Sequence, residues 1–130
     1  MSLHIVNICV DCADPRTLAA WWGRVLELPV FDDDADGDDE ETGMTLPDGR
    51  DLVFLRVPEP KTVKNRLHLC LAPSGEDDRR DAEVERLLAM GATLVDDLRA
   101  EDGTGWAVLA DPEGNEFCVL RGEAERAATS

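Results

Sequence analysis

The chain has 130 residues, 43% of them hydrophobic and 32% charged, which is enough for one globular domain with a sizeable core. Its 29 acidic and 13 basic residues give a formal net charge of -16. Such a charge repels phosphate backbones and anionic lipid headgroups, so we expect neither nucleic acid nor a membrane surface as a partner. It favours cationic ligands or, alternatively, serves solubility alone. The composition excludes collagen, coiled coil and wholesale disorder.

No apolar run approaches the roughly 18 residues of a membrane-spanning helix, and the first residues lead straight into a strand pattern. We therefore expect a cytoplasmic protein. Its cysteines lie mostly inside apolar runs and are expected to be reduced thiols rather than a disulfide framework. They are Cys9, Cys12, Cys70 and Cys118. The C-x-x-C of the first two lies in a strand pattern, away from the helix N-terminus that a redox pair requires.

The first half of the chain predicts one strand, one helix and three further strands. The first strand is expected over 3–11. Asp14 then supplies an N-cap and Pro15 a proline at the first helical position, and the helix that they begin is expected to end at Pro29. The three further strands are predicted at 30–32, 44–46 and 51–57.

The second half repeats this order after a linker, 58–64, that contains two prolines. A strand at 66–71 is followed by a helix over 77–90, for which Gly91 is the C-terminal stop. The remaining strands are predicted at 93–95, 106–110 and 115–120. The tail, 123–130, is expected to be frayed.

Each half therefore predicts a β-α-β-β-β module, 3–57 and 65–122, and the two align residue by residue as an internal repeat within one domain, 1–130. The aligned segments are 6–10 with 67–71, at an offset of 61, and 48–56 with 113–121, at an offset of 65.

Alternation along the strands separates two faces of the expected sheets. The apolar face, expected to pack under the helices, carries Val6, Ile8, Val10, Leu52, Phe54, Leu67, Leu69, Leu71, Phe117 and Val119. The other face is too polar for a dry core, which predicts a partly wet ligand-binding cleft or, alternatively, a solvent-facing or interface side. The candidate cleft residues are Asn7, Cys9, Val53, Leu55, Arg66, His68, Cys70, Trp106, Glu116 and Cys118. Arg66 and Glu116 are expected near the rim, paired with each other or with charges of the ligand.

The paired modules, the segment KTVKNRLH at 61–68 and the segment WAVLADPEGNEFCVL at 106–120 resemble the glyoxalase/bleomycin resistance/dioxygenase superfamily. This is also called the vicinal oxygen chelate superfamily, and the chain is most similar to its glyoxalase-like branch. The resemblance covers nearly the whole chain apart from the acidic loop and the tail. It implies an α+β fold in which a curved mixed sheet surrounds a cleft. Isomerases, dioxygenases, lyases and drug-sequestering proteins share this fold.

The resemblance also implies where a metal would bind. Metal-using members place two histidines and two glutamates on the first and last strands of each module, and the matching positions here are Asn7, Val53, His68 and Cys118. Because Val53 cannot ligate and both carboxylates are lost, we expect no metal at this quartet, no cofactor and no glyoxalase I activity. A zinc site on His68 and Cys118, with Cys70 or Cys9 nearby, would need three or four donors in tetrahedral range.

These features favour a metal-independent protein that binds, and sequesters, a small cationic or antibiotic-like ligand. The alternative is a lyase, isomerase or dioxygenase of unknown substrate, for which His68 is the only catalytic candidate. A third hypothesis is a pseudo-enzyme that functions through its dimer surface. A homodimer is expected because small open sheets expose their edges.

One further segment, 32–41, carries eight acidic residues in ten and copies the opening of an EF-hand loop. Counted from Asp32, the twelfth position of such a loop is Gly43 and not the glutamate that an EF-hand requires, and strands instead of helices are expected on both sides of the loop. A mobile acidic loop is therefore favoured over a weak cation site.

Overall fold

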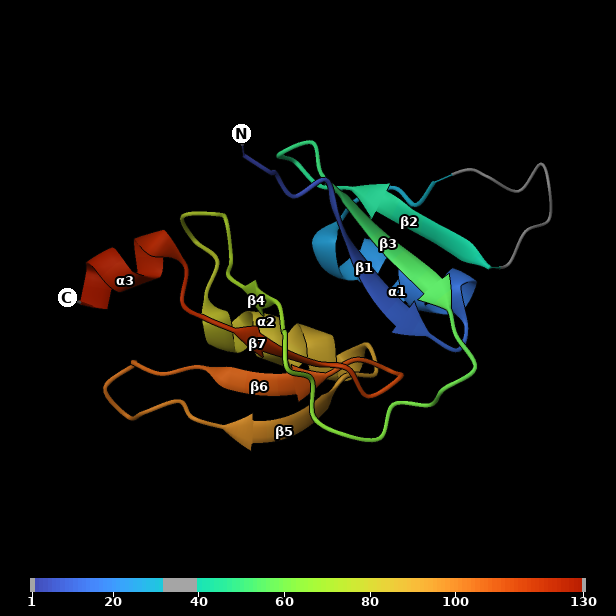
Figure 1. Cartoon of the computed structure of the whole chain (residues 1–130). Helices are drawn as coiled ribbons and strands as arrows, with labels where there is room; N and C mark the ends of the chain where they lie inside the picture. Colours follow the sequence, from blue (N-terminus) through green and yellow to red (C-terminus); the bar gives the residue numbers. More distant parts are fainter. Residues whose placement is uncertain (1, 32–39, 130) are drawn as a thin grey trace. The chain divides into compact units, whose positions relative to one another are not determined.

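The computed structural model describes residues 2–31 and 40–129 and divides into two compact units, Met1–Lys61 and Thr62–Ser130 (Figure 1). The division falls inside the predicted linker, 58–64. Each unit packs a helix against its own mixed sheet, in agreement with the predicted α+β class. The acidic loop predicted at 32–41 lies outside the described residues except for Glu40 and Glu41.

The first unit contains three strands and one helix. In chain order they are β1 (Asn7–Cys12), α1 (Pro15–Leu26), β2 (Glu41–Thr45) and β3 (Asp51–Arg56). The sheet order is β1-β3-β2, with β1 parallel and β2 antiparallel to the central strand. The strand predicted at 30–32 is wrong for its described residues. Residues 30 and 31 are in no paired strand, although the N–H of Phe31 donates a hydrogen bond to the carbonyl oxygen of Gly43 at 2.8 Å.

Helix α1 begins where the sequence predicts. The Asp14 carboxylate accepts hydrogen bonds from the backbone N–H and the hydroxyl of Thr17, and these bonds lower the pKa of Asp14 below its ordinary value. The helix ends three residues before Pro29, at Leu26, because Glu27 adopts a left-handed conformation with φ 57°. Its apolar stripe is buried and consists of Leu18, Trp21, Trp22 and Val25.

The second unit follows the predicted order of its module. Its elements are β4 (Cys70–Leu71), α2 (Arg80–Ala89), β5 (Thr93–Asp97), β6 (Ala107–Ala110), β7 (Glu116–Val119) and α3 (Glu123–Thr129). The sheet order is β4-β7-β6-β5, with β4 parallel to β7 and the other pairs antiparallel. In both units the first strand therefore lies parallel to the last one.

Three expectations for this unit need correction. The strand predicted at 66–71 is reduced to two residues, and the helix predicted at 77–90 begins only at Arg80. The frayed tail is instead the helix α3, which is held by a hydrogen bond from the backbone N–H of Arg80 to the Glu125 carboxylate at 2.8 Å.

The two strand faces separate only in part, because Val53 and Cys118 of the face predicted to be partly wet are themselves buried, at 8% and 4% exposed. Phe54 and Phe117 are fully buried, whereas Val6 and Leu67 are 65% and 92% exposed. The last two precede the first paired residue of their strands, so no neighbouring strand holds them against the core. The prediction that they pack under the helices is wrong.

The turn between β6 and β7 sets the register that the site depends on. The Asp111 carboxylate accepts hydrogen bonds from the backbone N–H groups of Glu113 and Asn115 at 2.9 and 3.0 Å, and Gly114 takes a φ of 91°. The resulting hairpin pairs Val108 with Cys118.

Candidate functional site

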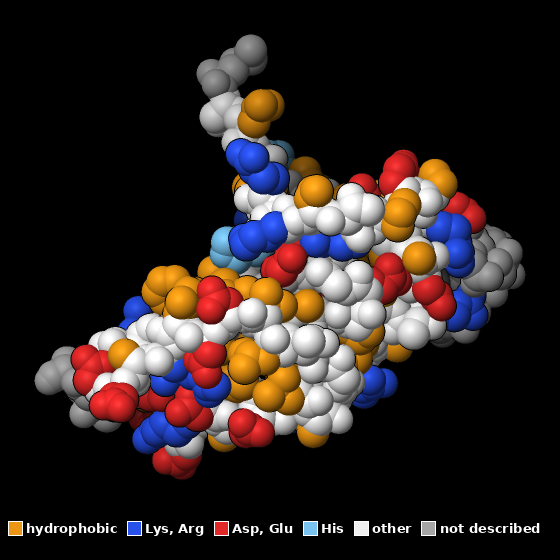
Figure 2. Space-filling view, turned by 90° about the horizontal axis from the view of Figure 1, so that it is seen from below, with side chains coloured by type: hydrophobic (Ala, Val, Ile, Leu, Met, Phe, Trp, Pro, Cys, Tyr) orange, Lys and Arg blue, Asp and Glu red, His pale blue; other side chains and the backbone are white. Residues whose placement is uncertain are grey.

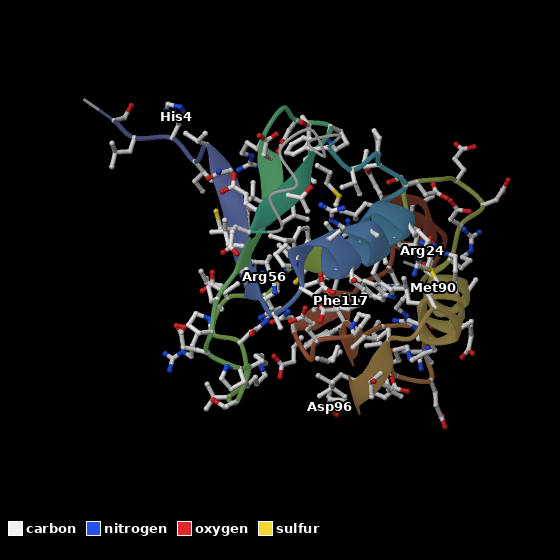
Figure 3. The ribbon with its side chains drawn as sticks, turned by 90° about the vertical axis from the view of Figure 1, so that its right-hand side faces the viewer. His4, Arg24, Arg56, Met90, Asp96 and Phe117 are labelled. Atoms are coloured by element: carbon white, nitrogen blue, oxygen red, sulfur yellow. The ribbon has the colours of Figure 1, made fainter. Side chains whose placement is uncertain are left out.

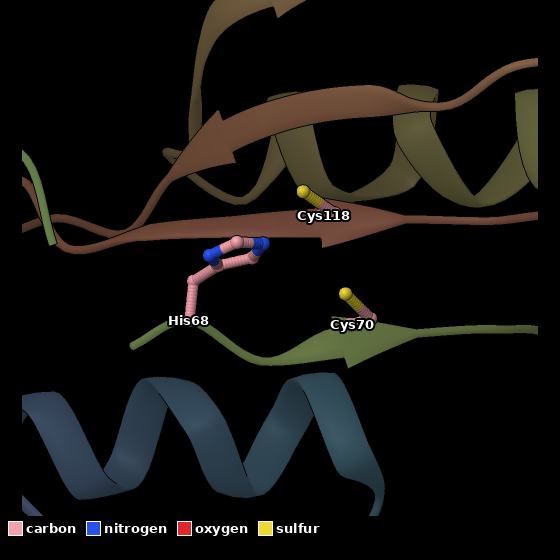
Figure 4. Close-up of side chains that lie close together, drawn as sticks. All are labelled: His68, Cys70 and Cys118. Carbon is pink, nitrogen blue, oxygen red and sulfur yellow. The ribbon is translucent and has the colours of Figure 1, made fainter. Parts of the chain in front are cut away.

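Three side chains of the second unit bring their ligating atoms together. The imidazole of His68 and the thiols of Cys70 and Cys118 place one nitrogen and two sulfur atoms within 4.8 Å of one another (Figure 4). We call these residues the His-Cys cluster. They form the only group of three or more histidine, cysteine, aspartate or glutamate ligands found with this spacing among residues 2–31 and 40–129.

The cluster follows from strand geometry. His68 and Cys70 are two residues apart in extended chain, so their side chains share one face. Cys70 lies opposite Cys118 in the parallel pair of β4 and β7, and the backbone N–H of Cys118 donates to the carbonyl oxygen of Leu69 at 2.9 Å. All three side chains therefore project from the same face of the sheet, while Phe117 is buried on the opposite face.

A second contact holds the segment that carries His68. The backbone N–H of Asn65 donates to the Glu116 carboxylate at 2.9 Å, and the Asn65 amide donates to the Glu116 carbonyl oxygen at 3.4 Å. Glu116, which was expected at the rim beside Arg66, thus fastens the chain three residues before His68. Arg66 itself is exposed.

The two thiols of the cluster differ in their surroundings. Cys118 is 4% exposed, and its burial raises the pKa of its thiol, with the neighbouring Cys70 adding to the rise. Cys70 and His68 are exposed. A buried, protonated thiol therefore forms the floor of the cluster beneath two groups that solvent and ligands can reach.

This difference predicts unequal thiol reactivity. In a buffer of pH about 8.5, the ordinary pKa of a thiol, iodoacetamide is expected to alkylate Cys70 several times faster than Cys118. The raised pKa of Cys118 leaves less of it as thiolate, and its burial restricts access by the reagent. Peptide mass mapping over time measures both rates in one sample, and the exposed Cys9 is the control. Equal rates for Cys70 and Cys118 would contradict the burial of the latter.

The other predicted cleft residues lie in both units. Trp106 is exposed and lies two residues before Val108, so alternation puts it on the face of Cys118. In the first unit, the register pairs Asn7 with Asp51, Cys9 with Val53 and Asp11 with Leu55. The convergence of these first-unit residues on His68 remains a prediction.

The strand pairing of the second unit repeats that of the first. Cys9 pairs with Val53 in the first unit, and Cys70 pairs with Cys118 in the second. Cys70 lies 61 residues after Cys9 and Cys118 lies 65 residues after Val53, which are the two offsets of the internal repeat. The thiols of Cys9 and Cys12, by contrast, share no face because an odd spacing separates them in one strand. All four cysteines lie within the described residues, and none is in a disulfide.

The chain lacks the carboxylate ligands of the metal site that the resemblance implies. Val53 presents a hydrocarbon side chain that is 8% exposed, and the position of Cys118 carries a thiol where a carboxylate would be needed. A hard, oxygen-preferring ion finds no carboxylate in the His-Cys cluster. Cys70, which the quartet does not include, is the third donor, and the i, i+2 spacing from His68 is the sequence signal that points to it.

Residues 7–120 match the family model of the glyoxalase-like domain. The chain belongs to this family. It lies within the glyoxalase/bleomycin resistance/dioxygenase superfamily, whose members include enzymes and resistance proteins. A search of curated proteins found no match to the chain.

Solved structures share the fold. A glyoxalase/bleomycin resistance protein/dioxygenase family enzyme from Burkholderia phytofirmans PsJN has a TM-score of 0.68 at 18% identity, covering 89% of this chain and 96% of that one. A mutant of the fosfomycin resistance protein FosX from Listeria monocytogenes, solved with Mn(II) and 1S,2S-dihydroxypropylphosphonic acid, has a TM-score of 0.69 at 14% identity, with coverages of 97% and 96%. A hypothetical protein from S. aureus has a TM-score of 0.70 at 14% identity, with coverages of 94% and 96%.

Proposed function

We propose that this glyoxalase-like protein binds a small cationic, antibiotic-like molecule at the face that carries the His-Cys cluster, and that sequestration is its activity. The observation that carries the proposal is the pairing of an exposed imidazole with an exposed thiol over a buried thiol, on the sheet face opposite Phe117. Imidazole supplies a hydrogen bond or a stacking surface for an organic ligand, and Trp106 extends the same face with an aromatic ring.

The charge of the chain supports a cationic ligand. A net charge of -16 raises the local concentration of cations and speeds their association. The absence of a carboxylate from the His-Cys cluster argues against proton abstraction by a metal-bound carboxylate at this position, and thus against glyoxalase I chemistry. The ligand is therefore held without a hard divalent ion.

A thermal-shift series tests this function. In buffer with a chelator, cationic antibiotics such as bleomycin and an aminoglycoside are compared with uncharged compounds of similar size. A cationic ligand at about 100 times its Kd should raise the melting temperature by roughly 8 °C, because it binds only the folded chain. If no member of the cationic set raises the melting temperature, the proposed function is wrong.

A histidine pair supplies the matched control. His68→Ala removes one hydrogen-bonding group from the face and is expected to weaken the cationic ligand roughly tenfold. His4 lies on the extended segment before β1 (Figure 3), and His4→Ala should leave the affinity unchanged. Equal losses in both variants would place the ligand elsewhere.

The protein is also proposed to act as a cytoplasmic homodimer with an internal repeat. Strand β5 is an edge of the second sheet, and apolar side chains on it and beside it are exposed: Leu94, Val95, Leu98 and Trp106. Figure 2 shows apolar side chains gathered among charged ones on the face seen from below. Burying such an edge against a second copy protects it from non-specific pairing.

A further inference from the structure

We propose that the His-Cys cluster is a zinc site confined to the second unit, with one coordination position left open. This inference goes beyond the proposed ligand binding and does not depend on it. The donor set is one imidazole nitrogen and two thiolate sulfurs, from His68, Cys70 and Cys118.

The distances allow a tetrahedral ion. Zinc bonds of about 2.3 Å to sulfur and about 2.0 Å to nitrogen put tetrahedral ligand atoms roughly 3.5–3.8 Å apart. The three donors already lie within 4.8 Å of one another, so movements of about 1 Å bring them into range. His68 and Cys70 are exposed and can rotate, while Cys118 is held by the paired strand β7.

The chemistry of the donors selects the ion. Thiolate and imidazole favour zinc and other soft or borderline ions over Mg²⁺, Ca²⁺ and Mn²⁺. On binding, two thiols each release a proton to solvent and the neutral imidazole donates its lone pair, so the two thiolates balance the charge of Zn²⁺ and no electron is transferred. Three protein donors leave the fourth position to water or a ligand atom, as in catalytic rather than structural zinc sites.

This site differs from the quartet at which no metal is expected. It needs neither Asn7 nor Val53, and it gains Cys70, which lies outside that quartet. The contact between Asn65 and Glu116 supports it, because it fastens the chain just before His68 and so limits the freedom of the imidazole.

Cobalt titration of the reduced chain tests the proposal, because thiolate-bound Co²⁺ gives a sulfur-to-cobalt charge-transfer band that oxygen ligands cannot give, and tetrahedral Co²⁺ gives d–d bands far stronger than those of the aqueous ion. We expect bands that saturate at one Co²⁺ per chain and vanish when Zn²⁺ is added. Cys70→Ser and His68→Ala should each abolish saturation at one equivalent. Cys12→Ala, which removes a buried thiol of the first unit that belongs to no proposed site, should leave the bands intact.

Circular dichroism confirms that each variant folds before its titration is scored. The absence of a thiolate band in the folded wild type would overturn the zinc site. So would bands that survive Cys70→Ser or are lost in Cys12→Ala. Since the ligand series is run with a chelator, failure of the zinc site leaves that result unaffected, and failure of ligand binding leaves the cobalt result unaffected.

Discussion

Phe117→Ala is expected to lower the free energy of unfolding by about 3–5 kcal/mol, the usual cost of a large cavity in a packed core. Phe117 is almost fully buried in β7 (Figure 3), and α2 packs against that strand. The neighbouring Cys118 faces the other side of the sheet. Cys118→Ala removes a single heavy atom and should cost only about 1 kcal/mol.

Urea denaturation followed by circular dichroism compares the two variants directly, since the substituted residues are neighbours in the same strand. A large difference in their midpoints is expected, because alanine leaves a large cavity at Phe117 and almost none at Cys118. Similar losses would mean that both side chains lie in the core, and the cluster would then be structural.

Arg80→Ala is expected to cost about 3 kcal/mol. The Arg80 guanidinium is 3% exposed and donates to the carbonyl oxygens of Gly103, Thr104 and Gly105 at 3.1, 3.1 and 2.9 Å, and it also pairs with Asp81. Hydrogen bonds from a charged group contribute more than neutral ones. Alanine removes the guanidinium from all three carbonyl oxygens, although that of Thr104 still accepts a hydrogen bond from the backbone N–H of Ala100.

Arg86 supplies the control on the same helix. It forms an i,i+3 ion pair with Glu83 at 2.9 Å in which the side chains are 37% and 31% exposed, and such pairs contribute less than about 1 kcal/mol. Arg86→Ala should therefore shift the urea midpoint only slightly. If the Arg80 and Arg86 variants lose the same stability, the loop at 103–105 is not held by the buried guanidinium.

Local signals explain which elements could be predicted. The start of α1 depends on Asp14, Thr17 and Pro15, which lie within four residues, so the sequence shows all of them. The helix α3 depends on Glu125 accepting a hydrogen bond from Arg80, 45 residues away, and no local pattern indicates that contact.

The strand predicted at 66–71 is longer than the observed β4 for a related reason. Its apolar alternation is clear, but only Cys70 and Leu71 have a paired neighbour, so Leu67 lies in solvent. Alternation predicts which residues would share a face and not where pairing begins.

In the candidate site, too, local patterns could be predicted and long-range contacts could not. Alternation predicts His68, Cys70 and Cys118 on one face, and in the structure their ligating atoms lie within 4.8 Å of one another. Their proximity depends on the register of β4 against β7, which arises from pairing across 48 residues. The engagement of Glu116 by Asn65 could not be predicted, because a carboxylate near a strand end has many possible partners.

The chain contains two histidines, His4 and His68, so a proton–carbon spectrum of the labelled imidazoles reports on the site with an internal reference. Titration of the chelator-treated protein with the tightest cationic antibiotic should move the ring signals of His68 to saturation and leave those of His4 in place, with His4→Ala giving the assignment. Binding detected by calorimetry with no movement of the His68 signals, or with both histidines moving together, would contradict a ligand site at the His-Cys cluster.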